Sequence, residues 1–126
     1  VRGRDIDLGR ATLDAALLAE LGIVLTTYET LRDYHMSFAR VPFDVVVFDE
    51  AQKTKNPTSQ LTRAAKTLNA RFKLALTGTP VENRLHDVWS ITDIIWSGRL
   101  GSSREFARRY ETDPSEGAGA LRQELM

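Results

Sequence analysis

Val45-Val-Val-Phe-Asp-Glu-Ala-Gln52 is an apolar run that ends in two adjacent carboxylates, and Leu76-Thr-Gly-Thr-Pro80 ends a second run in a small, hydroxyl-rich loop. The apolar residues predict strands at residues 43–48 and 72–77, because a parallel strand that is covered on both faces is nearly continuous in apolar residues. In an open parallel sheet, ligands bind at the carboxyl ends of the strands. We therefore expect the two polar loops to face one site.

Strand and helix patterns alternate along the rest of the chain. A short apolar run at residues 23–26 predicts a third strand. Helical patterns occupy residues 11–21, 28–34, 56–68, 82–96 and a short segment that begins with the capping-box spacing of Ser102 and Glu105. The alternation predicts an α/β fold with a parallel sheet flanked by helices.

Three local features carry further expectations. Asn56 followed by Pro57 is the expected N-cap and first residue of a helix. Trp89 and Trp96 are seven residues apart, which predicts that both face the core. Residues 112–126 contain a proline and two glycines and are typical of a linker.

The composition fits a globular chain of one domain or less. The 126 residues are 42% apolar and 27% charged, with 17 Lys plus Arg against 17 Asp plus Glu. This balance creates no global positive field for nucleic acid, so any such contact must be local. Cysteine is absent, which excludes disulfides and thiolate metal sites and fits a reducing compartment. No apolar stretch approaches the roughly 18 residues of a membrane span, which predicts no membrane partner.

The adjacent carboxylates after the first strand fit the chemistry of a magnesium nucleotide. Asp49 is expected to bind the magnesium shell through water, and Glu50 to polarise the water that attacks the γ-phosphate. In the alternative interpretation, Asp49 only caps the following turn. An acyl-phosphate mechanism is excluded for the Thr-Gly-Thr loop, because Ala75 stands where a cation-pumping ATPase carries its nucleophilic aspartate.

The sequence lacks a glycine-rich loop that ends in Gly-Lys-Ser/Thr, the usual cradle for nucleotide phosphates. We therefore expect part of an ATPase motor rather than a whole one. A partial sheet has unpaired edges and exposed apolar surface, which predicts self-association of the isolated chain. Residues 1–126 alone are expected to hydrolyse ATP negligibly, and hydrolysis that Glu50→Gln abolishes would contradict this.

Three segments occur in order and together are similar to one family. They are Thr26-Thr-Tyr-Glu-Thr-Leu31, the box Asp49-Glu-Ala-Gln52 continuing into Lys55-Asn56, and Leu74-Ala-Leu-Thr-Gly-Thr-Pro-Val-Glu-Asn-Arg-Leu85 with Trp89. The pattern closely resembles the Swi/Snf-type DNA translocases of helicase superfamily two, over roughly residues 4–111. The DEAQ box and compact layout look more like bacterial or archaeal members, which implies a cytoplasmic location at the nucleoid.

The resemblance implies a partial RecA-like P-loop NTPase lobe at residues 1–111, the first of two lobes, followed by a linker or the start of the next segment at residues 112–126. It implies ATP and Mg²⁺ as cofactors, and double-stranded DNA and a second RecA-like lobe as partners. Asp49 and Glu50 match the Walker B residues, and Gln52 matches a position that links the nucleotide site to the coupling motif. The implied coupling loop consists of Thr77, Gly78, Thr79 and Pro80. The implied DNA contacts are Thr26, Thr27, Tyr28, Asn83 and Arg84, with Lys53 and Lys55 as possible additions to the phosphate track.

Other interpretations stay open on the sequence alone. Tyr28 is as consistent with partial burial beside a strand end as with a DNA contact, and Lys53 and Lys55 are as consistent with a solvated loop. The whole chain could instead be a naturally truncated, non-catalytic remnant that binds DNA or protein. An RNA helicase of the DEAD-box type fits less well, because such proteins usually carry Ser-Ala-Thr where this chain has Thr77-Gly-Thr79.

Overall fold

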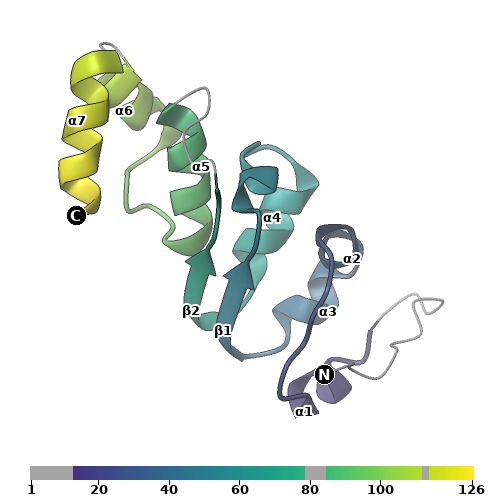
Figure 1. Ribbon diagram of the computed structural model, residues 1–126. Helices are drawn as coiled ribbons and strands as arrows, with labels where there is room; N and C mark the ends of the chain where they lie inside the picture. Colours follow the sequence, from purple (N-terminus) through teal and green to yellow (C-terminus); the bar gives the residue numbers. More distant parts are fainter. Residues whose placement is uncertain (1–12, 79–84, 112–113) are drawn as a thin grey trace.

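The computed structural model describes residues 13–78, 85–111 and 114–126 and confirms the expected α/β class with a parallel sheet. Figure 1 shows its elements. They are α1 (Ala15–Glu20), α2 (Tyr28–Asp33), α3 (His35–Ala39), β1 (Phe43–Phe48), the 3₁₀ helix η1 (Ala51–Thr54), α4 (Gln60–Thr67), β2 (Ala70–Ala75), α5 (Leu85–Ile95), α6 (Ser103–Phe106), the π-helix η2 (Ala107–Glu111) and α7 (Pro114–Leu125). None of the helices in these ranges combines the length and apolar character that a membrane crossing requires.

β1 and β2 form a two-stranded parallel sheet, and η1 and α4 make the connection between them (Figure 1). The register places Val45 opposite Phe72. Past the strand ends, Leu76 N donates a hydrogen bond to Phe48 O at 2.8 Å, and Ala51 N donates to Leu76 O at 2.9 Å. These two bonds extend the pairing, so the loops that follow β1 and β2 begin side by side.

One face of the sheet is covered by helices and the other is exposed. Phe48 and Val46 pack with buried residues of α4 and α5, including Ala65 and Ile94. The opposite face consists of apolar side chains that are at least 39% exposed: Val45, Val47, Phe72 and Leu74. Within the described residues only one face is covered, because α4 and α5 pack into the same core cluster, and the second apolar face of the strands is exposed. The exposed face is the surface on which self-association would occur, and self-association stays a prediction.

Residues 23–26 do not form the expected third strand. They pair with neither strand of the two-stranded sheet. Ile23 is 77% exposed and Leu25 is 96% exposed, whereas Val24 packs partly against the core. A strand needs hydrogen-bonding partners on a neighbouring strand as well as an apolar composition. The composition of this segment was thus an insufficient basis for the prediction.

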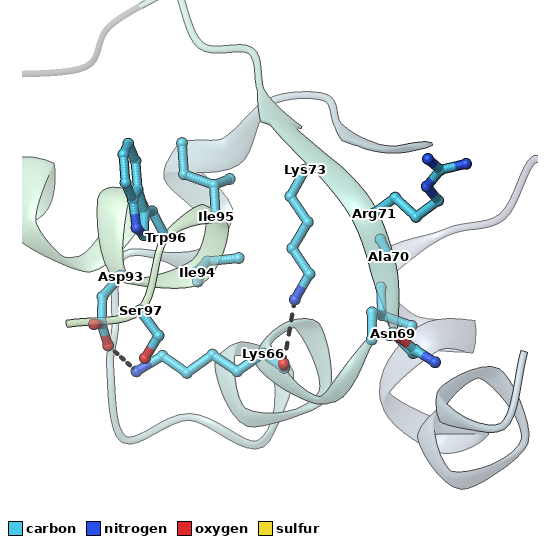
Figure 2. Close-up of a pocket in the computed structure, with 11 residues that line it drawn as sticks. Lys66, Asn69, Ala70, Arg71, Lys73, Asp93, Ile94, Ile95, Trp96 and Ser97 are labelled. Atoms are coloured by element: carbon cyan, nitrogen blue, oxygen red, sulfur yellow. Dashed lines mark hydrogen bonds and ion pairs between the residues drawn. The ribbon is translucent and has the colours of Figure 1, made fainter. Parts of the chain in front are cut away.

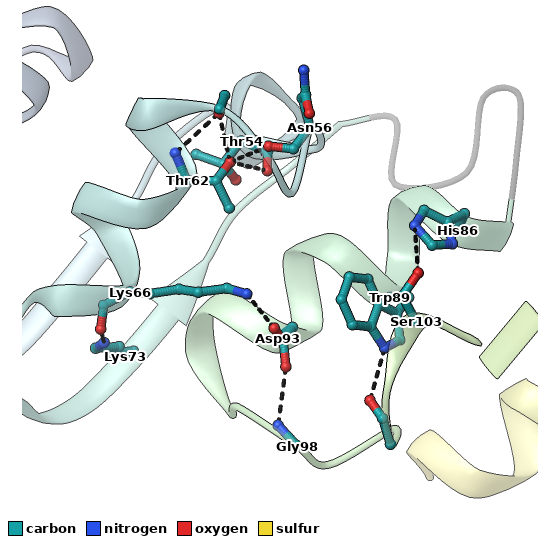
Figure 3. Close-up of polar contacts among 12 residues, drawn as sticks. Thr54, Asn56, Thr62, Lys66, Lys73, His86, Trp89, Asp93, Gly98 and Ser103 are labelled. Carbon is teal, nitrogen blue, oxygen red and sulfur yellow. Dashed lines mark hydrogen bonds and ion pairs between the residues drawn. The ribbon is translucent and has the colours of Figure 1, made fainter. Parts of the chain in front are cut away.

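α4 begins later than the sequence indicates. Its N-cap is Ser59, whose hydroxyl accepts a hydrogen bond from Thr62 N at 3.1 Å. Asn56 caps a turn instead, because its Oδ1 accepts from Thr58 N at 3.1 Å. The fully buried Thr62 hydroxyl lies 2.9 Å from Thr54 O and 2.6 Å from Asn56 O (Figure 3). These contacts hold the end of η1 against the first turn of α4.

The two tryptophans differ in environment. Trp89 is only 7% exposed, and its Nε1 donates a hydrogen bond to Gly101 O at 3.0 Å, whereas Trp96 is 65% exposed. The expectation that both face the core is wrong for Trp96, which directly follows the last residue of α5, Ile95, and whose backbone N–H still donates to Thr92 O at 2.8 Å. Trp96 instead lies beside Arg99, whose guanidinium is 5.4 Å from the ring centroid.

An ion pair joins α4 to α5. Lys66 Nζ donates to Asp93 Oδ2, and Asp93 Oδ1 accepts from Gly98 N at 3.0 Å (Figure 3). Burial raises the pKa of the Asp93 carboxyl, but the hydrogen bonds from Lys66 and Gly98 outweigh burial, and the net pKa lies below its ordinary value. The charged carboxylate therefore holds the end of α5 against α4.

We expect Asp93→Asn to lower the free energy of unfolding by about 1–2 kcal/mol at neutral pH, because the amide oxygen can still accept from Gly98 N but loses the charge that faces Lys66. Since the folded-state pKa of Asp93 is depressed, its contribution is present above the ordinary aspartate pKa and is lost as the pH falls through the folded-state value. Urea unfolding of the protein between about pH 7 and pH 3 measures this difference. The control is Asp33→Asn, which removes an exposed ion pair with Arg32 and should matter far less. If the two substitutions lowered the free energy of unfolding equally, the Lys66–Asp93 ion pair would not be the stabilising contact that we infer.

The C-terminal residues form a small second cluster around η2. The capping box at Ser102 is confirmed, since Ser102 Oγ accepts from Glu105 N and Glu105 Oε2 accepts from Ser102 N at 2.8 Å. Residues 114–125 form the helix α7, where the sequence favoured an irregular linker. A Cβ at Gly117 would lie 1.9 Å from Tyr110 O, so this glycine permits the close contact of α7 with η2. The division of the chain after residue 111 stays a prediction.

Candidate functional site

The turn that follows β1 holds both carboxylates of the candidate site, and both are exposed. Glu50 has φ 51° and ψ 49°, the left-handed conformation, and is the one non-glycine residue with positive φ in the described part of the chain. This conformation costs an L-residue on the order of 1 kcal/mol, so it needs support from its surroundings. Asp49 supplies part of the support, because its Oδ1 accepts a hydrogen bond from Glu50 N at 2.9 Å. Asp49 thus binds the backbone of its own turn, whereas the helix η1 that follows has no side-chain cap, and the carboxylate remains at the surface.

Gln52 connects the acidic turn to the loop that follows β2. Its Nε2 donates to Glu50 Oε2, and its Oε1 accepts a hydrogen bond from Thr77 Oγ1 at 2.7 Å. We call Glu50, Gln52 and Thr77 the relay. These contacts bring the two polar loops into one site, as the sequence predicts. The relay connects the carboxylate at one strand end to the hydroxyl at the next through a single amide group.

Tyr28 joins the start of α2 to the same turn. Thr27 is the N-cap of α2, and its hydroxyl accepts a hydrogen bond from Thr30 N at 3.2 Å, which orients the first helical turn. Tyr28 OH donates to Asp49 O at 2.6 Å. Burial raises the pKa of the Tyr28 hydroxyl to about 12, and the carboxylates of Asp49 and Glu50 add to this effect. The hydroxyl therefore stays protonated, and able to donate, throughout the physiological pH range.

The structure thus shows the half-buried position beside a strand end that was one of two interpretations of Tyr28. A DNA contact by this residue stays a prediction. The sequence offers no spacing rule for its hydrogen bond to Asp49, because the two residues are 21 positions apart. Thr27 is a good N-cap residue directly before Tyr28. It is the one local signal that could have placed Tyr28 at the start of a helix.

The remaining predicted residues are exposed or lie outside the described residues. Lys53 Nζ is 6.0 Å from the centroid of the Tyr28 ring. Lys53, Lys55, Thr26 and Gly78 are exposed. Thr79, Pro80, Asn83 and Arg84 lie outside the described residues. Within the described ranges, no group of three or more His, Cys, Asp or Glu is placed to hold a metal ion.

A separate pocket of about 350 Å³ lies at the other end of β2 (Figure 2). Its lining includes Lys66, Lys73 and Trp96, and none of the predicted site residues. Lys73 Nζ donates to Lys66 O at 3.3 Å, and burial lowers the pKa of the Lys73 ammonium. The pocket is distinct from the candidate site, because it opens beside the start of β2 rather than at its carboxyl end.

A parallel strand–helix–strand unit with polar loops at the carboxyl ends of its strands is consistent with a RecA-like lobe. The sequence profile of the SNF2-related domain matches residues 4–126. The chain therefore belongs to the SNF2-related domain family, which confirms the resemblance to Swi/Snf-type proteins.

Individual relatives agree with this assignment. Zorya protein ZorD of Escherichia coli O139:H28 (strain E24377A / ETEC) is 55% identical over 91 residues, which are 72% of this chain and 8% of that protein. An uncharacterized ATP-dependent helicase of Mycoplasma pneumoniae (strain ATCC 29342 / M129 / Subtype 1) is 39% identical over 94 residues, which are 75% of this chain and 9% of that protein. The Sulfolobus solfataricus SWI2/SNF2 ATPase core in complex with dsDNA is 40% identical with a TM-score of 0.67, over 75% of this chain and 20% of that chain. The likeness confirms the RecA-like fold.

The chain spans less than a tenth of the length of these curated relatives and a fifth of the solved Sulfolobus chain. The family match and the structural likeness show that the chain is SNF2-family ATPase domain sequence, homologous to helicase-like translocases. What a whole protein with this domain does needs a separate argument.

Proposed function

We propose that this chain carries the Walker B and coupling motifs of an ATP-dependent motor that translocates on double-stranded DNA and remodels what is bound to it. The relay is the observation that carries the proposal, because it joins an exposed carboxylate after β1 to a hydroxyl after β2. Such a connection lets the state of a nucleotide beside Glu50 change the position of the loop that begins at Thr77. The ATP-dependent helicases among the relatives support a nucleotide as the substrate.

In this proposal, the acidic turn performs the ATPase chemistry. Asp49 would hold Mg²⁺ through its water shell, and a single exposed carboxylate fits a metal that keeps several waters and is otherwise bound by phosphates. When bound, the metal neutralises charge that develops on the phosphates. Glu50 would accept a hydrogen bond from the attacking water and orient it. Gln52 would report this state to the coupling loop, which consists of Thr77, Gly78, Thr79 and Pro80.

Duplex DNA and a second RecA-like lobe are the partners that we propose. The DNA contacts would be made by Thr26, Thr27, Tyr28, Lys53, Lys55, Asn83 and Arg84. Hydroxyls, amides and cationic side chains bind phosphates without reading base sequence, which suits a motor that moves along DNA. The dsDNA complex of the Sulfolobus relative supports this choice. The second lobe would close the nucleotide site, and a cytoplasmic location follows from a DNA substrate in a bacterial or archaeal cell.

The test is ATP hydrolysis by the longest native polypeptide that carries these residues, measured with and without duplex DNA. We expect turnover that duplex DNA stimulates about tenfold or more, because DNA binding organises the catalytic loops. Hydrolysis that single-stranded RNA stimulates but duplex DNA does not would indicate an RNA helicase.

A non-catalytic remnant that binds DNA or protein is the alternative function. The strained Glu50 backbone and the intact relay argue against it, because a remnant has no use for a costly conformation. Absence of turnover under every condition, with duplex DNA still bound, would favour the remnant.

A further inference from the structure

We infer that Tyr28 is a positioning residue that transmits DNA binding at the start of α2 to the acidic turn after β1. The inference rests on the proposed function and names the contact through which duplex DNA regulates the ATPase site. That contact is the 2.6 Å hydrogen bond from Tyr28 OH to Asp49 O.

The hydrogen bond acts on the peptide group that determines the backbone of Glu50. Asp49 O belongs to the peptide group that joins Asp49 to Glu50, and the tilt of this group sets the φ angle of Glu50. Two hydrogen bonds hold the group: Tyr28 OH binds its oxygen, and Asp49 Oδ1 binds its N–H at 2.9 Å. Without the Tyr28 hydroxyl, the oxygen loses its hydrogen bond and only the Asp49 side chain still holds this peptide group, so Glu50 leaves φ 51° more easily for the right-handed region that L-residues prefer.

The other end of the contact lies where we propose that DNA binds. Tyr28 is the first residue of α2 and directly follows the N-cap Thr27. Thr26 precedes it in the chain and is exposed, and Lys53 Nζ lies 6.0 Å from the Tyr28 ring centroid. A DNA phosphate bound by Lys53 beside the ring, and by Thr26 two residues before it in the chain, would therefore restrict the Tyr28 ring.

Restriction of the Tyr28 ring has a direct consequence for catalysis. The ring carries the hydroxyl that holds Asp49 O, so a fixed ring keeps Glu50 in the left-handed conformation. The Glu50 carboxylate is also the first group of the relay. DNA binding thus stabilises both the orientation of the water-activating carboxylate and its connection to the coupling loop.

The test measures amide hydrogen exchange at residues 49–52 in the longest native polypeptide, without nucleotide, in the absence and presence of a blunt-ended duplex oligonucleotide. Wild type is compared with Tyr28→Phe, which keeps the ring and removes the hydroxyl. The matched control is Tyr110→Phe, which removes a tyrosine hydroxyl that donates to Glu124 in the C-terminal cluster. Fluorescence anisotropy with the same oligonucleotide shows that each variant is saturated with DNA.

We expect saturating DNA to slow this exchange about tenfold in wild type and Tyr110→Phe, and less than about twofold in Tyr28→Phe. In parallel, kcat at saturating DNA should fall about tenfold in Tyr28→Phe, with KM for ATP changed less than about twofold, because the hydroxyl acts on the orientation of Glu50 rather than on ATP binding.

Equal slowing in wild type and Tyr28→Phe, or no slowing in DNA-saturated wild type, would overturn the inference and leave the proposed function standing. Failure of the duplex to bind wild type would overturn the DNA part of the proposed function and the inference with it. The anisotropy measurement separates these two cases.

Discussion

Glu50→Gln is expected to lower DNA-stimulated kcat about 100-fold or more, which corresponds to about 2.7 kcal/mol of activation free energy. Glutamine has nearly the shape of glutamate, and its side-chain oxygen can still accept the hydrogen bond from Gln52 Nε2. The turn and the relay therefore stay in place, and the variant loses the negative charge that orients the attacking water. Because ATP binding does not need this charge, KM for ATP should change less than about threefold.

The matched control for this prediction is Glu29→Gln. Glu29 is also an exposed glutamate near the site, in the first turn of α2, but it has no role in the relay. Steady-state ATP hydrolysis of the longest native polypeptide with duplex DNA measures both variants. We expect Glu29→Gln to retain wild-type turnover. Wild-type turnover in Glu50→Gln would instead show that another residue activates the water.

Gln52→Ala and Thr77→Val are expected to lower DNA-stimulated kcat by similar factors, about tenfold each. Alanine removes the amide that binds both neighbours, and valine removes the hydroxyl that donates to Gln52 Oε1 at 2.7 Å while keeping the side-chain volume. Each substitution breaks the same connection between the acidic turn and the loop after β2. The double variant should therefore be no more than about twofold worse than either single variant, because two residues of one network are not additive.

The control for the relay is Thr67→Val, which removes an exposed threonine hydroxyl that donates to Ala64 O at 2.7 Å within α4. It makes the same chemical change as Thr77→Val outside the site and should leave turnover unchanged. Stopped-flow measurements of ATP binding separate a loss of coupling from a loss of affinity. If the effects of Gln52→Ala and Thr77→Val multiplied in the double variant, the two residues would act independently and the relay would be disproved.

Local patterns in the sequence were sufficient for the class of fold and for several element ends. The apolar run before Asp49 predicts β1, and the spacing of Ser102 and Glu105 predicts the capping box that the structure contains. Both depend on residues a few positions apart, whose interactions the backbone geometry dictates directly. The parallel arrangement followed from the alternation of strands and helices.

The incorrect predictions share a different cause. Residues 23–26 have the composition of a strand but pair with no strand of the described sheet. Trp96 follows the periodicity of α5 but lies beyond its last residue, Ile95. Gly117 is typical of a linker, yet it allows α7 to approach Tyr110 closely. The outcome at residues 23–26 and at Gly117 depended on a neighbour elsewhere in the chain, which a local pattern does not reveal.

The sequence by itself identified the side chains on which the proposed chemistry rests: the carboxylates Asp49 and Glu50, the amide of Gln52 and the hydroxyl of Thr77. Only the tertiary structure decided how they are connected. Gln52 and Thr77 are 25 positions apart and meet because β1 and β2 pair in parallel. Tyr28 reaches Asp49 across 21 positions because α2 begins beside the end of β1. Such contacts depend on the packing of whole elements, and no spacing along the chain encodes them.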